Sequence, residues 1–138
     1  MGSGWLTERL IAIIKNIRYE NLCKVYPVSF GVYKDDKLKA GEFGIICGKV
    51  YSSYSGYYEE SNAGKVQMIL TASYLRDNAF SFWDLGMPIP YKNKLGAKDI
   101  DFKCFIDKFR KASQEELNMD WVNERVNERI VHSVTSDN

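Results

Sequence analysis

Asp84 is the side chain in this sequence best placed to do chemistry. It ends a short apolar run, residues 80–84, that is typical of a buried strand, and Gly86 follows two residues later. Removal of a carboxylate from water raises its pKa, and a carboxylate in that setting can accept a proton from an attacking amine. Asp84 also has a purely structural interpretation, in which it ends the strand and accepts hydrogen bonds from loop N–H groups. Both interpretations stay open at this point.

Other familiar catalytic arrangements are absent from the sequence. His132 is the only histidine, so a Ser-His-Asp or Cys-His mechanism is excluded. Cys23, Cys47 and Cys104 are far apart and form no C-x-x-C pair. We therefore expect no metal site, no disulfide framework and no cofactor.

Residues 62–65, N-A-G-K, open a predicted helix and form a candidate anion site. A helix N-terminus with a small residue attracts phosphate groups, which makes Asn62 and Lys65 candidate substrate-binding residues. Lys65 could equally be an ordinary solvated lysine. Glu59 and Glu60 would repel a pyrophosphate, and the glycine signature of a coenzyme A loop is missing. Acetyl-CoA-dependent acetylation is therefore the weakest of the candidate activities.

Composition indicates one ordinary globular domain without a strong field for nucleic acid. The 138 residues are 45% hydrophobic and 27% charged, with a net charge of +1. An RNA partner would need a local basic patch, and the candidates are Lys92, Asn93, Lys94 and Lys98, or Lys103, Lys108, Arg110 and Lys111. A signal peptide and an 18-residue apolar run are both missing, so we expect a cytoplasmic protein without a membrane partner.

Periodicity predicts the elements that must position these residues. Helices are expected at 5–17, 62–76, 101–110 and 113–130, and strands at 27–34, 38–47, 49–57 and 80–84. Ser61 or Asn62 is expected to cap the second helix and Asp101 the third. A capping box, S-Q-E-E at 113–116, opens the last one. Pro88 and Pro90 are expected to prevent regular structure until Leu95.

The order and spacing of several short motifs resemble one known family. The motifs are W-L-T at 5–7, the glycines 41, 44 and 48, N-A-G-K at 62–65, F-W-D-L-G at 82–86 and L-G-A at 95–97. Together they resemble the C-terminal domain of the leucyl/phenylalanyl-tRNA-protein transferases over about residues 5–109. The resemblance implies an acetyltransferase-like (GNAT) α/β fold. It implies a mostly antiparallel twisted sheet of six or seven strands, covered by helices.

Several residues differ from those that carry the family's chemistry. Tyr54 stands where the family has a glutamate implicated in holding the α-amine, and Gly56 replaces a methionine of the side-chain pocket. Gly86 replaces the glutamine paired with the acid, and Tyr91 replaces a histidine. Asp84 alone is kept as the catalytic candidate. The substrate-binding candidates are Tyr54, Gly56, Tyr57, Asn62, Lys65, Trp83 and Gly86.

The resemblance implies aminoacyl transfer from the 3′ end of an aminoacyl-tRNA to the N-terminal amine of a protein or peptide. A second hypothesis is a catalytically inactive relative that binds a peptide or a protein. We expect residues 1–112 to form the GNAT-like domain and residues 113–138 a C-terminal helical extension. That helix would either pack on the domain or join two copies as a homodimer.

Overall fold

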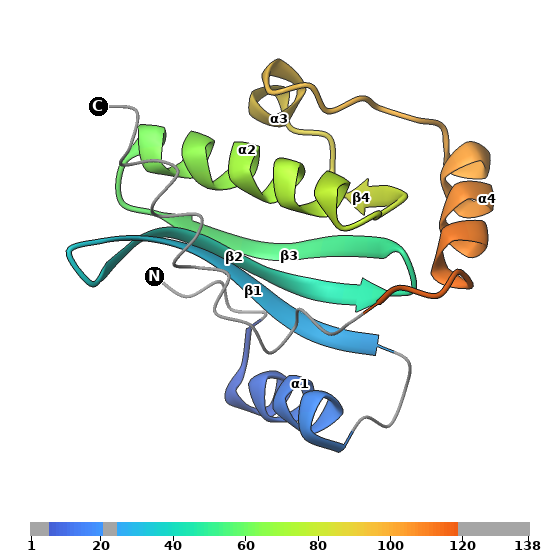
Figure 1. Cartoon of the computed structure of the whole chain (residues 1–138), viewed down its shortest axis with the longest axis horizontal. Coiled ribbons are helices and arrows are strands. Elements are labelled where there is room, and N and C mark those ends of the chain that lie inside the picture. The colour runs from blue at the N-terminus through green and yellow to red at the C-terminus, as the bar shows by residue number, and fades with distance from the viewer. Residues whose placement is uncertain (1–5, 21–24, 119–138) are drawn as a thin grey trace.

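The computed structural model describes residues 6–20 and 25–118 of the chain. Its elements, in chain order, are α1 (Glu8–Glu20), β1 (Val25–Lys34), β2 (Lys37–Cys47), β3 (Val50–Tyr58), α2 (Ser61–Asp77), β4 (Phe82–Asp84), α3 (Pro90–Lys94) and α4 (Phe102–Ser113). The four strands form one sheet in the order β1-β2-β3-β4 (Figure 1). The expected combination of a sheet and covering helices is confirmed.

The sheet is mostly antiparallel, as predicted. β1 pairs with β2 and β2 with β3 as hairpins, whereas β4 returns parallel to β3 after the crossover through α2. The described residues hold four strands rather than six or seven. The difference arises because residues 85–118 form α3, α4 and loops instead of further strands.

Two tight turns set the register of the meander. Asp35 and Asp36 both have positive φ, 52° and 59°, which is the conformation of a two-residue type I′ hairpin turn. At the β2–β3 turn, Gly48 has φ 58°. A Cβ on Gly48 would also lie 2.4 Å from the carbonyl oxygen of Ser113, so only glycine fits there.

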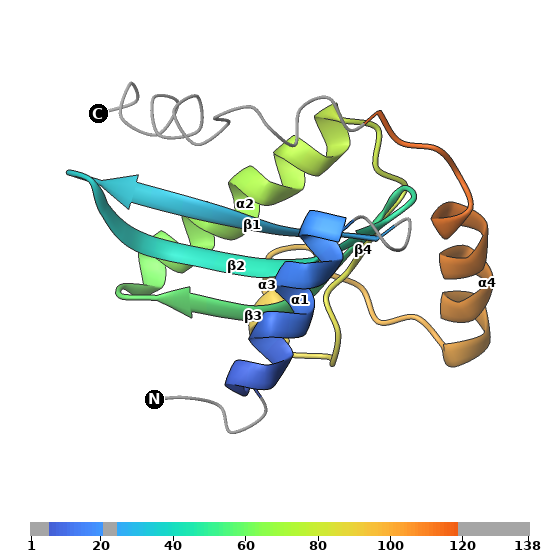
Figure 2. The ribbon, with the colours of Figure 1, turned by 90° about the horizontal axis from the view of Figure 1, so that it is seen from below.

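The core lies between the sheet and α2. Phe30, Ile46, Tyr51 and Leu75 form its buried centre. α1 packs on the opposite face of the sheet, so the sheet is covered on both sides (Figures 1 and 2). The interior is therefore a three-layer arrangement of helix, sheet and helix.

Gly44 allows two strands to come close together. A Cβ at Gly44 would lie 2.0 Å from the carbonyl oxygen of Ser52 on β3. Next to this contact the β2–β3 register shifts, and the pairing passes from Ser53 to Ser55 without using Tyr54. β3 therefore carries a bulge at Tyr54.

The predicted helix start at Ser113 is wrong. Ser113 is the last residue of α4, and its hydroxyl donates to the carbonyl of Arg110. The helix ends there because its C-terminal carbonyls meet the β2–β3 turn: the backbone N–H of Lys49 donates to Ala112 over 2.9 Å. Lys49 also forms an ion pair with Glu115 at 3.6 Å. Residues 116–118 have no regular structure, and the rest of the predicted helix, with its proposed dimer contact, lies outside the described residues.

Two smaller expectations also need correction. Glu60, rather than Ser61 or Asn62, is the N-cap of α2, and no side chain hydrogen-bonds there. Pro90 starts the short helix α3 instead of excluding one, because proline at the first helical position lacks only an N–H that would have no partner anyway. The cap of α4 is confirmed, with Asp101 accepting a hydrogen bond from the backbone N–H of Cys104.

Candidate functional site

Asp84 ends β4, and both of its carboxylate oxygens accept hydrogen bonds. The hydroxyl of Ser52 donates to Oδ2 over 3.2 Å from the neighbouring strand. The backbone N–H of Gly86 donates to Oδ1 over 2.9 Å, which Gly86 achieves with φ 76°. Asp84 is half-buried, so its position is fixed while part of it stays accessible. The hydrogen bond to a loop N–H that the structural interpretation of Asp84 predicted is present. Because Asp84 is also partly exposed, a role in proton transfer is compatible with this contact.

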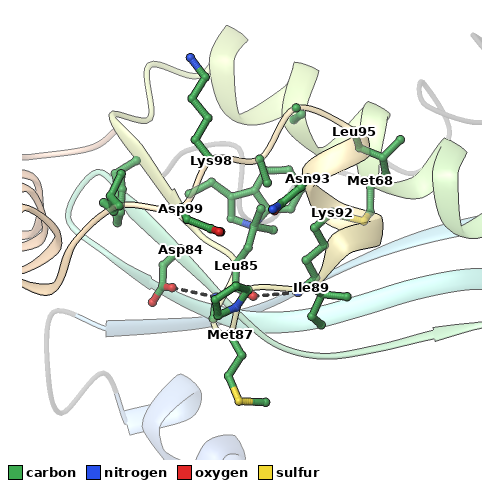
Figure 3. Close-up of a pocket in the computed structure, with 18 of the residues that line it drawn as sticks. Met68, Asp84, Leu85, Met87, Ile89, Lys92, Asn93, Leu95, Lys98 and Asp99 are labelled. Atoms are coloured by element: carbon green, nitrogen blue, oxygen red, sulfur yellow. Dashed lines mark hydrogen bonds between the residues drawn. The ribbon is translucent and has the colours of Figure 1, made fainter.

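A groove of about 1320 Å³ lies beside Asp84. Its walls come from one flank of α2, from β4, from the loop 85–89, from α3, and from the loop 95–100 with the start of α4. Figure 3 shows Asp84 and Leu85 on one side of this space, with Met68, Asn93 and Leu95 grouped on the other. The volume is above the roughly 300–1,000 Å³ of small-molecule sites, so the groove is a candidate for binding a larger substrate.

Lys92 holds the loop after β4 against α3. Its ammonium group donates to the carbonyl of Leu85 over 2.7 Å (Figure 3). This contact and the Gly86–Asp84 hydrogen bond fix the first two residues of the loop, Leu85 and Gly86. The wall of the groove next to the carboxylate is therefore ordered by named contacts.

Charge along the groove is mostly positive. The cations in its lining are Arg76, Lys92, Lys98 and Lys108. The carboxylates in the same lining are Asp84 and Asp99. The two basic patches predicted from the sequence thus contribute residues to one groove, where they would favour an anionic ligand.

The structure brings only some of the predicted site residues together. Trp83 and Gly86 line the groove with Asp84. Tyr54, Gly56 and Tyr57 lie on β3 beyond the end of the β3–β4 pairing and are not part of its lining. These three substrate-binding candidates therefore do not share this groove with Asp84.

The remaining candidates also lie elsewhere. Asn62 and Lys65 are exposed in the first turn of α2, at the end of that helix away from β4 (Figure 1). Tyr91 lies on α3 but outside the groove lining. The role of each of these residues in substrate binding stays a prediction.

A polar cluster around Glu42, on the α2 face of the sheet, was missed by the sequence reasoning. Its carboxylate accepts hydrogen bonds from Tyr51 at 3.1 Å, from Gln67 at 2.8 Å and from Ser53. The indole N–H of Trp83 donates to Ser53 over 2.8 Å and links the cluster to β4. The sequence did contain a signal for this cluster, because Glu42 falls on the inward-facing positions of an alternating strand.

Tyr51 is fully buried in this cluster. Burial, and then the negative charge of Glu42, raise the pKa of its phenol well above the ordinary value. Tyr51 therefore stays a neutral hydrogen-bond donor to Glu42 at ordinary pH.

Two further properties concern the described part of the chain. Residues 6–20 and 25–118 contain no group of three His, Cys, Asp or Glu side chains that could hold a metal ion. Among the helices in those ranges, none has both the length and the hydropathy needed to span a membrane.

Comparison with known proteins identifies the class to which this fold and groove belong. A family model described as "Leucyl/phenylalanyl-tRNA protein transferase" matches residues 2–110. That match covers most of the chain. The chain therefore belongs to the leucyl/phenylalanyl-tRNA protein transferase family, as its motifs predicted.

Individual relatives carry the same name, leucyl/phenylalanyl-tRNA–protein transferase. The protein of Shewanella piezotolerans is 30% identical over 99 residues, which are 71% of this chain and 42% of the relative. That of Maridesulfovibrio salexigens is 29% identical over 79 residues, 57% of this chain and 33% of the relative. That of Synechocystis is 23% identical over 108 residues, 78% of this chain and 52% of the relative. The chain thus spans between a third and about half of the length of these relatives.

Proposed function

We propose that this chain transfers an aminoacyl group from an aminoacyl-tRNA to the N-terminal amine of a protein or peptide. The observation that supports this most directly is the fixed, half-buried carboxylate of Asp84 at a large groove, in a chain that belongs to this family. Because the matching residues span only a third to about half of these relatives, their activity is a proposal for this chain. A cytoplasmic location is part of the same proposal, since charged tRNA is found there.

Asp84 would act as the proton acceptor. The acceptor amine attacks the ester carbonyl carbon of the aminoacyl-tRNA, a C–N bond forms, and the C–O bond to the terminal ribose breaks. The proton lost by the amine passes to Asp84 and then to the departing ribose oxygen, so charge and atoms balance. Ser52 and Gly86 would hold the carboxylate in one orientation throughout.

The charge of the groove suits the donor. Lys98 and Lys108 line it and take part in none of the ion pairs found within the described residues. They are therefore available to the phosphates at the end of a tRNA, which bind cationic side chains through electrostatic attraction. The apolar side chains in the lining of the groove would bind the amino-acid side chain of the donor.

Replacement of Asp84 tests this assignment. Asp84→Asn keeps the shape: its amide oxygen can still accept from Gly86, and its NH₂ group can donate to the Ser52 hydroxyl. It removes the base, so turnover should fall by about 10²–10⁴. The assay uses leucyl- or phenylalanyl-tRNA with a peptide that begins with Arg or Lys. Circular dichroism and the melting temperature show whether the variant keeps its fold.

Asp107→Asn is the matched control, because Asp107 is exposed on α4 and does not line the groove. It should leave turnover within twofold of the wild-type value. Equal activity of wild type and Asp84→Asn would show that Asp84 is not the base. A wild-type protein without activity across several charged tRNAs would remove the proposed function itself.

A catalytically inactive binding protein is the second candidate. It is favoured by the loss of four family residues, at the positions of Tyr54, Gly56, Gly86 and Tyr91. Under this alternative the protein binds the acceptor peptide saturably but forms no product with any charged tRNA. The same transfer assay, run beside a binding measurement, distinguishes the two.

A further inference from the structure

The outer edge of β3 is unpaired over most of its length. The β3–β4 ladder contains three residue pairs and ends at Ser52↔Asp84. On the other side, β3 stays paired with β2 as far as Tyr58. No backbone hydrogen bond found outside the regular ladders of residues 25–118 involves residues 53–58. In Figure 2, β3 and β1 are the two outer strands of the three long ones, with β2 between them.

The direction of the backbone groups follows from the hairpin. The pair at Cys47 flanks a two-residue turn, so its members exchange hydrogen bonds with each other. Steps of two along β2 from Cys47 reach Gly41, the partner of Tyr57. The backbone groups of Tyr57 thus face β2, and those of Gly56 and Tyr58 face the open side. An unpaired row of this kind is a template for another extended chain.

The side chains along this edge are exposed and suited to a peptide. Tyr54 is 49%, Tyr57 50% and Tyr58 62% exposed. Neighbouring residues of a strand point to opposite faces, so Tyr57 and Tyr58 provide aromatic surface on both sides of the edge. Tyrosine at such positions offers apolar area together with a hydrogen-bonding hydroxyl.

Charge near this edge is mostly negative, in contrast to the groove. Asp84 lies at one end of the open stretch, and Glu59 and Glu60 follow its other end. Glu59 is paired with Lys39 at 2.8 Å. Glu42, cross-strand from Gly56, receives its hydrogen bonds from neutral groups. A segment with positive charge complements this surface.

We propose that residues 53–58 bind the N-terminal segment of the acceptor polypeptide as an added strand parallel to β3. The segment takes the position that β4 leaves after Asp84, so its α-amine lies next to that carboxylate. The open stretch is about 17 Å long at roughly 3.3 Å per residue, which accommodates four to five residues. Main-chain hydrogen bonds supply the affinity, as in other cases of strand addition. The identity of the occupant depends on the proposed function.

Backbone methylation of the ligand tests the geometry without changing the protein. The probe is an Arg-initiated hexapeptide with a C-terminal fluorescein, titrated by anisotropy against the full chain in the absence of tRNA. Alternate residues of an added strand face β3, so methyl groups on alternate backbone nitrogens should weaken binding at least tenfold. Methyl groups on the intervening nitrogens should change it by less than twofold.

A variant of the protein gives the complementary result. Gly56→Pro removes an N–H on the open side, where an edge strand tolerates proline. It should weaken peptide binding at least tenfold with little change in melting temperature. Gly56→Ala is the matched control and should bind within twofold of wild type, because its Cβ would meet nothing closer than 3.7 Å.

Several outcomes would overturn the inference. The first is that methyl groups weaken binding equally at every backbone nitrogen of the peptide. The second is that a folded Gly56→Pro variant binds the peptide as tightly as wild type. The third is that a CCA-ended RNA oligonucleotide displaces the peptide, which would assign the edge to RNA. The proposed function fails separately. If binding alternates with methyl position but no transfer occurs, strand addition stands and transferase activity falls. If transfer occurs without alternation, only strand addition falls.

Discussion

At the scale of single residues, the hydrogen bonds of Glu42 show how a carboxylate is kept inside the sheet without a cation. Its donors are a phenol, a hydroxyl and an amide, from Tyr51, Ser53 and Gln67. Gln67 is itself buried and also donates to Thr71 over 2.9 Å. Removal of one donor from such a network leaves the carboxylate poorly solvated.

Tyr51 makes the stability of the fold sensitive to alkaline pH. Burial and Glu42 raise its pKa, so in the folded protein it keeps its proton above pH 10, where a tyrosine in the unfolded chain begins to lose it. The unfolded state then binds fewer protons than the folded state. The free energy of unfolding should therefore fall by up to about 1.4 kcal/mol per pH unit above pH 10 from this residue alone.

Urea unfolding at pH 9, 10 and 11 measures this effect. Tyr51→Phe should have a shallower slope against pH than wild type, because the titrating group is gone, although its stability at pH 8 should be lower by about 1 kcal/mol from the lost hydrogen bond. Tyr54→Phe, with a half-exposed ring, should keep the wild-type slope. Parallel slopes for wild type and Tyr51→Phe would contradict the argument.

At the scale of elements, the contact between α4 and the β2–β3 turn explains why a glycine is needed at one position. Gly48 has positive φ and lies against the last carbonyls of α4. Gly96 also has positive φ, 107°, but a Cβ there would meet nothing within 4 Å. A side chain at Gly96 would therefore cause backbone strain alone, whereas a side chain at Gly48 would cause both backbone strain and a steric clash.

Alanine at these two positions should give different losses. Gly96→Ala should cost about 1 kcal/mol from backbone strain alone. Gly48→Ala should cost roughly 2 kcal/mol or more, since the helix end must also move away from the turn. Chemical denaturation measures both values. Equal losses would mean that α4 shifts freely and does not constrain the turn.

The sequence predicted strands and helices where periodicity was strong and failed where tertiary contacts decide. Alternation and turn residues indicated the β1–β2 hairpin, and Asp101 was correctly expected as a cap. The capping box at Ser113 was overridden because α4 docks on the β2–β3 turn. Such docking joins segments more than sixty residues apart, and local pattern contains no information about it.

The candidate site was predictable to the same limited extent. Asp84 was found because an acid after an apolar strand is visible in the sequence. The cluster at Glu42 combines residues from two strands and a helix, so it became visible only when the register was known. The division of charge between the groove and the edge of β3 likewise depends on which side of the sheet each segment covers.

At the scale of the whole molecule, two surfaces of different charge meet at Asp84. The basic groove lies beyond β4, and the acidic open edge continues along β3. In the proposed reaction, a donor with phosphates and an acceptor with a basic N-terminus would each be drawn to a different surface, with the carboxylate between them. The net charge of +1 hides this division, because the opposite contributions cancel in the sum.

The short parallel ladder also has a consequence for cooperativity. Its last pair, Ser52 and Asp84, joins residues 32 positions apart, whereas the meander of β1, β2 and β3 is closed by two-residue turns. Long-range pairing carries a larger loop-closure entropy, so β4 should be the last strand to dock during folding and the first to detach in local unfolding. Amide hydrogen exchange should then be faster at Phe82, whose backbone N–H donates to the carbonyl of Lys49, than at Ile45. Equal rates would show that all four strands open as one unit. The carboxylate would therefore leave its position at temperatures where the meander is still intact, and the proposed transfer activity would be lost before the protein melts.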